Sequence, residues 1–167
     1  MKTIASHQNR LFKNLITPAK KILVPIDFSA GSRPQLQLAA AMAGVLKATL
    51  VLLYIAETDP SGSHLGDCHL PVLEADLRRL AKKQLAKLKM EEIPPGTLSQ
   101  SIIGAGRPDR EILATAKDLN VDLIVMATHS AGSGQGQLGS TAGRVASLAS
   151  CPVMLVPIQE PTVPFFL

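Results

Sequence analysis

An almost uninterrupted apolar run at residues 48–56 limits the possible folds more than any other feature of the chain. A strand with one face in water alternates apolar and polar residues, because successive side chains point to opposite faces. The run Ala-Thr-Leu-Val-Leu-Leu-Tyr-Ile-Ala does not alternate in this way. Burial on both faces is typical of a strand in a parallel sheet that helices cover on both sides. This segment therefore predicts an α/β fold.

The rest of the chain alternates strand-like and helix-like segments. The expected strands are residues 22–26, 48–56, 97–103, 121–127 and 152–157, and the expected helices are residues 33–46, 72–90, 109–119 and 139–150. The weaker strand 97–103 is expected near an edge, and a turn is expected from residue 104 to residue 108. This alternation, with right-handed crossovers, predicts a single-domain, doubly wound five-stranded parallel sheet with helices on both faces.

The longest expected helix, residues 72–90, is amphipathic. Its buried side is expected to carry five leucines, Leu73, Leu77, Leu80, Leu85 and Leu88. Its basic residues are Arg78, Arg79, Lys82, Lys83, Lys87 and Lys89. Long basic side chains on one side of a helix are usually solvated, so we interpret them as a surface stripe and not as a binding patch.

The net charge of +4 comes from one end of the chain. Residues 1–21 contain five basic residues and no acid, whereas the remainder has 12 basic and 13 acidic residues. The remainder has no basic patch with interleaved aromatic residues, so nucleic-acid binding is not expected. No apolar run approaches the roughly 18 residues that cross a bilayer, so no membrane association is expected. Two cysteines imply no disulfide framework, and we expect a reduced, cytoplasmic location.

We divide the chain into a basic extension (residues 1–19), one domain (residues 20–158) and a tail (residues 159–167). Apolar residues alternate with basic ones in the extension, which leaves a mitochondrial-type presequence as one interpretation. The extension lacks the continuous apolar core of a secretory signal. We favour a loosely ordered extension before the first strand.

Polar residues follow two of the expected strands. Asp27 comes directly after strand 22–26, and Thr128 and His129 come directly after strand 121–127. Ligands of doubly wound sheets bind beyond the carboxyl ends of the strands, where the strand order reverses. We expect these two strands to flank that point, so their polar residues should converge. Asp27 would then contact a ligand such as a ribose hydroxyl, or it would serve only as a turn or capping residue.

A glycine-rich segment, residues 131–138, leads into a helix that opens with Gly139, Ser140 and Thr141. The start of a helix has unpaired N–H groups and a favourable dipole, and glycine allows a ligand to approach the backbone. This arrangement captures phosphate groups, so nucleotide binding is the leading hypothesis. The alternative is that Ser140 only caps the helix.

Other chemical patterns are incomplete. Gly134, Gly136 and Gly139 match the dinucleotide fingerprint formally, but they begin several residues after the strand, and the lysine of a phosphate-binding P-loop is absent. Asp27, His129 and Ser140 could form a hydrolytic triad, but no nucleophile elbow surrounds Ser140. The cluster His64, Cys68 and His69 matches no strong zinc spacing, so we expect a solvated loop there. We predict no catalytic residue, no metal ligand and no enzyme, although slow hydrolysis of a bound nucleotide is left open.

Taken together, these motifs resemble the universal stress protein family from about Lys20 to Pro157. The resemblance is carried by residues 21–29 (KILVPIDFS), 106–108 (GRP), 121–129 (VDLIVMATH), 139–142 (GSTA) and 151–157 (CPVMLVP). The resemblance implies a Rossmann-like sheet of strand order 3-2-1-4-5 and a homodimer formed through residues 152–157.

The ATP-binding branch of that family has the pattern Gly-x-x-Gly, nine residues, then Gly-Ser or Gly-Thr. In this chain Ala127 and Ser130 stand at the two glycine positions, and eight residues separate Ser130 from Gly139. Alanine at the first position is harmless if its backbone angles are ordinary, whereas serine would be strained at a positive φ.

By position, the resemblance implies a site for ATP, or a related adenine nucleotide, with Mg²⁺. The implied binding residues are Pro25, Ile26, Asp27, Ile55, Met126, Ala127, His129, Ser130, Gly136, Gly139, Ser140 and Thr141. The implied function is that of a stress-response sensor or signalling module. The alternative is a dimeric protein-interaction module of the same family that binds no nucleotide.

Overall fold

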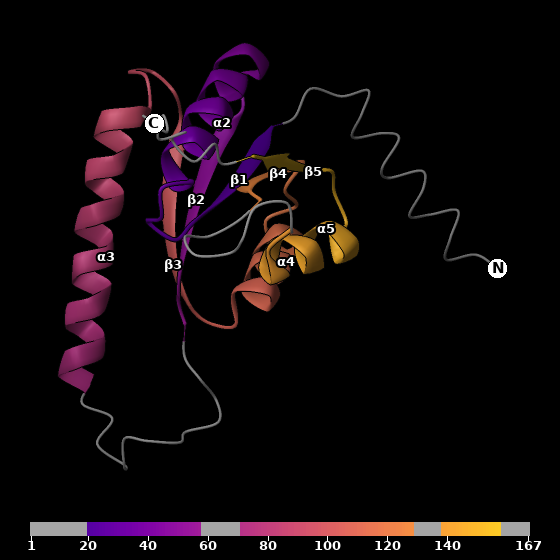
Figure 1. Cartoon of the computed structure of the whole chain (residues 1–167). Coiled ribbons are helices and arrows are strands. Elements are labelled where there is room, and N and C mark those ends of the chain that lie inside the picture. Colours follow the sequence, from indigo (N-terminus) through magenta and orange to yellow (C-terminus); the bar gives the residue numbers. More distant parts are fainter. Residues whose placement is uncertain (1–19, 58–70, 129–137, 158–167) are drawn as a thin grey trace, which may run out of the picture.

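The computed structural model describes residues 20–57, 71–128 and 138–157. Within those residues the chain alternates strands and helices from β1 to β5 (Figure 1). The elements are β1 (Lys21–Ile26), α2 (Ser32–Leu46), β2 (Thr49–Glu57), α3 (Pro71–Glu92), β3 (Ser99–Gly106), α4 (Pro108–Asp118), β4 (Leu123–Ala127), α5 (Ser140–Leu148) and β5 (Val153–Val156).

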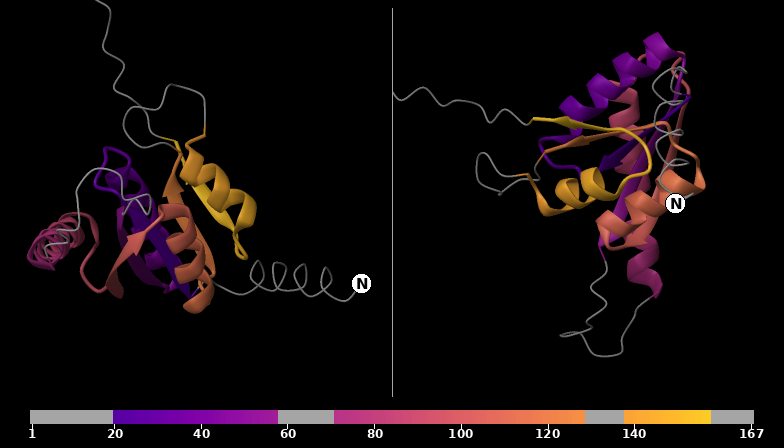
Figure 2. Two further views of the ribbon diagram at one scale, coloured as in Figure 1. Left: turned by 90° about the horizontal axis from the view of Figure 1, so that it is seen from below. Right: turned by 90° about the vertical axis from the view of Figure 1, so that its right-hand side faces the viewer.

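The five strands form one parallel sheet of order β3-β2-β1-β4-β5. Helices α2 and α3 cover one face, and α4 and α5 cover the other, as the two views of Figure 2 show. This arrangement confirms the predicted doubly wound fold and its strand order. The order reverses between β1 and β4, so these two strands flank the switch point.

The buried strands follow from their apolar runs. In β1, Ile22, Leu23 and Val24 are all inaccessible to solvent. Ile22 and Val24 belong to the core under α2 and α3, whereas Leu23 belongs to the core under α4 and α5. β2 divides in the same way, with Leu52 on one side and Val51 on the other. Because helices cover both faces of the sheet, successive residues of a strand must all be apolar.

The edge strand β3 is displaced from its predicted position. It begins at Ser99 and continues to Gly106, so residues 104–106 belong to the strand and not to a turn. β2 is long enough to pair with it as far as Glu57, which lies opposite Gly106. The neighbouring strand therefore overrides the local tendency of the two glycines to form a turn.

Helix α3 buries only part of the leucine side that its sequence predicts. Leu85 and Leu88 are buried, but Leu77 and Leu80 are 53% and 52% exposed, so their predicted burial is wrong. The side chain of Leu73 lies outside the described residues. Figure 1 shows the first turns of α3 reaching below the sheet, where the described strands offer them little surface.

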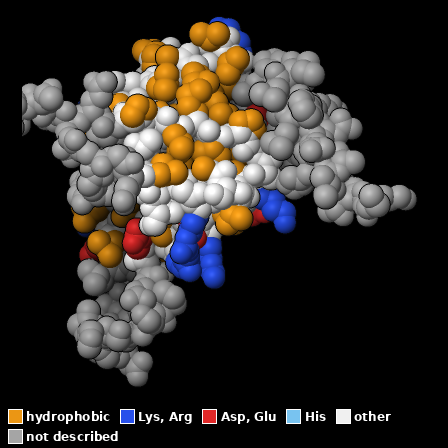
Figure 3. All heavy atoms as spheres, turned by 45° about the vertical axis from the view of Figure 1, so that its right-hand side comes forward, with side chains coloured by type: hydrophobic (Ala, Val, Ile, Leu, Met, Phe, Trp, Pro, Cys, Tyr) orange, Lys and Arg blue, Asp and Glu red, His pale blue; other side chains and the backbone are white. Residues whose placement is uncertain are grey.

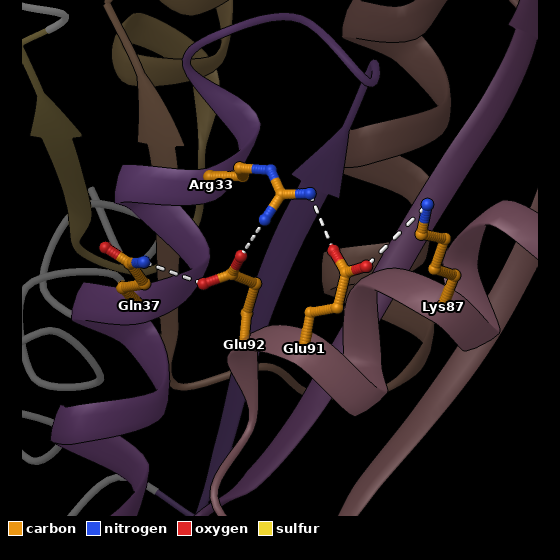
Figure 4. Close-up of polar contacts among 5 residues, drawn as sticks. All are labelled: Arg33, Gln37, Lys87, Glu91 and Glu92. Atoms are coloured by element: carbon orange, nitrogen blue, oxygen red, sulfur yellow. Dashed lines mark hydrogen bonds and ion pairs between the residues drawn. The ribbon is translucent and has the colours of Figure 1, made fainter.

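Ion pairs join the last turn of α3 to the first turn of α2 (Figure 4). Arg33 contacts Glu91 at 2.6 Å and also Glu92. Gln37 donates to Glu92 at 2.7 Å, and Lys87 lies 3.7 Å from Glu91. The cluster fixes these two helices relative to each other on one face of the sheet.

Candidate functional site

A pocket opens where β1 and β4 separate. β1 pairs with β4 only at Ile22 and Leu23, and the pocket begins beyond these pairs, at the carboxyl ends of the strands. Nine of the twelve predicted binding residues line it: Pro25, Ile26, Asp27, Ile55, Met126, Ala127, Gly139, Ser140 and Thr141. The other three, His129, Ser130 and Gly136, lie outside the described residues.

Asp27 and Thr128 converge on this pocket, as expected for residues that follow β1 and β4. The lining also includes residues that were not among the predicted ligand contacts, namely Gln35, Leu53, Glu57, Pro108, Ile112, Thr128 and Ala142. Most of them are core or helix-start residues whose part in a pocket depends on tertiary packing. The sequence does contain one indication that Gln35 is buried: it stands four residues before Ala39, so it lies on the apolar side of α2.

Asp27 organises the turn between β1 and α2. Its Oδ1 accepts hydrogen bonds from the backbone N–H of Ser29 and from Oγ of Ser32, each at 2.9 Å. These bonds support Phe28 at a φ of +60°, a conformation that is costly for a bulky residue. Asp27 is therefore a turn residue in this structure, and its exposed carboxylate also lines the pocket.

Gln35 spans the gap between the two diverging strands. Its Nε2 donates to the carbonyl of Pro25 at the end of β1, and its Oε1 accepts from the N–H of Ala127 at the end of β4. The side chain comes from α2 and is buried, with 3% of the residue exposed. The two strands therefore stay connected at the pocket through a side chain, although their own ladder has ended.

The start of α5 lies at the end of β4. The N–H of Gly139 donates to the carbonyl of Thr128 at 2.8 Å, which fixes the helix start against the strand end. Gly139 is the N-cap and Ser140 is the first helical residue, so Ser140 is not the cap that one interpretation of the sequence gave it. No side chain within the described residues caps this helix. Its first N–H groups thus lie where an anion would be stabilised.

Ala127 has no positive φ, since the three non-glycine residues with positive φ in the described part of the chain are Phe28, Lys47 and Asn120. An alanine can therefore occupy this glycine position of the ATP-binding pattern without backbone strain.

The pocket is acidic. Asp27 and Glu57 line it, and its described lining residues include no lysine or arginine. The sequence from residue 129 to residue 142 has no lysine or arginine either. Within the described lining, N–H groups and hydroxyls are the groups that could hold a phosphate, and a polyphosphate would meet two carboxylates unless a cation offset them.

A charged cluster ties α4 to α5 beside the pocket. Asp109 accepts from Arg107 at 3.0 Å and from Arg144 of α5 at 3.2 Å. Burial raises the pKa of Asp109, but its hydrogen bonds to the two guanidinium groups outweigh burial and lower the pKa below its ordinary value. The cluster joins the start of α4 to the middle of α5.

Two further observations concern the described part of the chain only. It contains no group of three or more His, Cys, Asp or Glu residues placed to hold a metal ion, and His64, Cys68 and His69 lie outside it. Its helices include none with the length and apolarity needed to cross a membrane.

The fold and the pocket together define a doubly wound α/β domain with a cavity at its switch point. The chain belongs to the universal stress protein family, whose family model matches residues 18–157. Universal stress protein A homolog 1 of Coxiella burnetii is 30% identical over 144 residues, which cover 84% of this chain and 98% of that protein. Universal stress protein YxiE of Bacillus subtilis is 31% identical over 144 residues, covering 81% and 97%.

Solved structures share the fold. Protein MJ0577 superposes with a TM-score of 0.75 at 27% identity and covers 87% of this chain and 99% of its own. A universal stress protein in complex with cAMP has a TM-score of 0.60 at 18% identity, covering 84% and 98%. One from Archaeoglobus fulgidus in complex with dAMP has a TM-score of 0.57 at 19% identity, covering 81% and 96%. At identities this low, the last two show the fold alone.

Proposed function

We propose that this protein binds ATP or a related adenine nucleotide at the ends of β1 and β4 and acts as a stress-response sensor or signalling module. The observation that carries the proposal is the start of α5, which lies beside the pocket, has no capping side chain among the described residues and is fixed to Thr128 by Gly139. The cAMP and dAMP complexes of two proteins with this fold support a nucleotide as the ligand class.

The pocket divides into an apolar part and a polar part. In the proposed complex the base lies among apolar side chains, with Met126 beside it and Ile55 against it from β2; these two residues are 6% and 9% exposed. Asp27 contacts a ribose hydroxyl. The N–H groups of residues 139–141, with the hydroxyl of Ser140, hold the phosphates. His129, Ser130 and Gly136 complete the phosphate site in this proposal.

Mg²⁺ accompanies a triphosphate in this proposal, for an electrostatic reason. Two carboxylates and no basic side chain line the described pocket, so an uncompensated triphosphate would be repelled. ATP binding should therefore depend strongly on Mg²⁺, and AMP binding should depend on it much less. Isothermal titration of both nucleotides, with Mg²⁺ and with EDTA, measures this difference.

The proposal includes a homodimer through residues 152–157. β5 is a sheet edge, and its residues Val153–Val156 are all partly exposed. Figure 3 shows hydrophobic side chains gathered on the side of the molecule where β5 lies. An apolar edge strand favours pairing with a second copy, because pairing satisfies its backbone groups. Leu155→Glu should give monomers in light scattering, whereas a wild type that is monomeric at every concentration excludes the dimer.

The second candidate is a dimeric interaction module of the same family that binds no nucleotide. The acidic lining of the pocket favours it, because the lining lacks a basic partner for phosphate among the described residues. In both candidates we propose a cytoplasmic protein that is not an enzyme.

Native mass spectrometry of freshly purified protein separates the two candidates. A mass increment equal to an adenine nucleotide, lost on denaturation, supports the first. Titration of folded, ligand-free protein with ATP, AMP and GTP follows. No heat with any of the three would reject the first candidate and leave the second.

A further inference from the structure

The amide of Gln35 is bound by one backbone group from each side of the switch point. Pro25 offers only a carbonyl, so Gln35 must direct Nε2 toward it, and the N–H of Ala127 must meet Oε1. The partners thus fix the orientation of the amide. Since 3% of Gln35 is exposed, water is a poor substitute for these bonds.

The strand register shows which bond the amide replaces. In a strand, backbone groups of successive residues point to opposite neighbours. The carbonyl of Lys20 accepts from the N–H of Thr49, the first residue of β2, and the carbonyl of Lys21 accepts from the N–H of Asp122, just before β4. Odd-numbered residues of β1 therefore bond toward β4.

Continuing the pairing of Leu23 with Ile124 by two residues places Pro25 opposite Met126. The next ladder bonds would join Pro25 N to the carbonyl of Val125, and Ala127 N to the carbonyl of Pro25. The first cannot form, because proline has no N–H. The second would use the same two groups that Gln35 binds. The side-chain amide thus occupies the place of a direct strand-to-strand hydrogen bond.

We infer that Gln35 is a positioning residue of the nucleotide site, because its amide keeps the ends of β1 and β4 apart by bridging Pro25 and Ala127. This inference rests on the proposed function. Pro25 and Met126 lie on either side of the gap and line the pocket, so the width of the gap decides whether a planar base fits between the strands. Without the amide, the strands either close on each other or leave two buried polar groups without partners.

Two substitutions separate the role of the amide from that of side-chain volume. Gln35→Met keeps the length and removes both hydrogen bonds. Gln35→Glu keeps the shape, and its ionised carboxylate still accepts from Ala127 but cannot donate to Pro25. The matched control is Gln37→Met on the same helix, because Gln37 is exposed and bonds to Glu92, away from the pocket.

The measurements are the Kd for AMP and for ATP with Mg²⁺, together with hydrogen exchange at the Ala127 amide in the absence of nucleotide. We expect Gln35→Met to weaken binding by about tenfold or more and to speed exchange at Ala127, with Gln37→Met like the wild type.

Gln35→Glu adds a pH signature. Burial beside Asp27 and Glu57, which line the same pocket, raises the pKa of the introduced carboxyl, and its protonated form can donate to Pro25. The ratio of its Kd to that of the wild type should therefore fall from about pH 8 to about pH 5. Using the wild type as the reference at each pH cancels any pH dependence of binding that the two proteins share. Should Gln35→Met not fold, this variant still tests the inference.

The outcomes distinguish the two claims. Wild-type protein that binds no nucleotide overturns the proposed function, and the role of Gln35 in it. Wild-type protein that binds, with both Gln35 variants binding equally well and Ala127 exchange unchanged, overturns the role of Gln35 alone.

Discussion

β1 pairs with its two neighbours over different lengths. With β2 the register runs from Lys21 opposite Thr49 to Ile26 opposite Tyr54, the whole of the strand. With β4 it covers only Ile22 and Leu23. On the closed side of β1, where it pairs with β2, the strands stay paired to the end of β1. On its open side, toward β4, the pairing stops early and a pocket begins.

Pro25 accounts for part of this difference. It pairs with Leu53 of β2 at a position where its missing N–H points away from that ladder. Toward β4, where the N–H would be needed, the ladder stops and Gln35 provides the connection. Pro25 therefore leaves the pairing of β1 with β2 undisturbed, and it prevents the ladder toward β4 from continuing where the pocket begins.

Loss of packing on the closed side should have the largest effect. Leu52 of β2 is inaccessible to solvent, so Leu52→Ala should lower the free energy of unfolding by about 2–5 kcal/mol through lost burial and a residual cavity. Denaturant unfolding measures it. Leu98→Ala is the control, because Leu98 is 69% exposed and should change stability by less than about 0.5 kcal/mol. Similar losses in both would mean that burial does not govern stability here.

On the open side, Gly139→Val should abolish nucleotide binding and leave the fold intact. Gly139 has a φ of −55°, which valine can adopt, but a branched side chain would block a phosphate from the start of α5. The loss of affinity should be at least about a hundredfold, or ~2.7 kcal/mol, so that no binding is detected. Titration calorimetry measures it, with circular dichroism as the check on folding. Gly139→Ala should weaken binding less, and equal affinity in all three proteins would place the ligand elsewhere.

Ser140→Ala should have a smaller effect on the same side. A hydroxyl that donates to a phosphate oxygen contributes ~1 kcal/mol or somewhat more, so the Kd should rise about fivefold to tenfold. Ser140 does not cap α5, so the free energy of unfolding should stay the same. A loss of stability with no change in Kd would assign Ser140 a structural role only.

The closed side was largely predictable from the sequence, and the open side only in part. Apolar runs such as residues 48–56 report burial directly, and they predicted the strands and the layers. The position of the pocket was predicted by the rule that ligands of such sheets bind at the switch point. The glycines of residues 104–106 were misread because β2, a distant segment, sets the length of β3. The role of Gln35 was missed because its two partners, Pro25 and Ala127, meet only through tertiary structure.

Helix α3 also shows that a local sequence pattern predicts burial only in part. Its periodicity identified the apolar side correctly at Leu85 and Leu88, but periodicity does not reveal how far neighbouring elements extend. Leu77 and Leu80 lie on the predicted side and are still about half exposed. Local patterns thus fix which side of a helix is apolar, and the packing partners decide how much of it is buried.

The smallest effect is expected at Asp109, beside the open side. Burial raises its pKa, but its bonds to Arg107 and Arg144 outweigh burial and lower the pKa. A lowered pKa means that the ionised carboxylate stabilises the fold above its unfolded pKa of about 3.9, and that this contribution is lost as the pH falls through the folded value.

Asp109→Asn should therefore be less stable than the wild type near neutral pH, and the two unfolding free energies should converge below about pH 4. Urea unfolding at a series of pH values measures the convergence. Asp118→Asn, at an exposed position on the same helix, is the matched control. A difference between wild type and Asp109→Asn that stays constant with pH would mean that the charge of Asp109 does not hold α4 against α5. In that case the geometry of the pocket wall would depend on apolar packing between these helices alone.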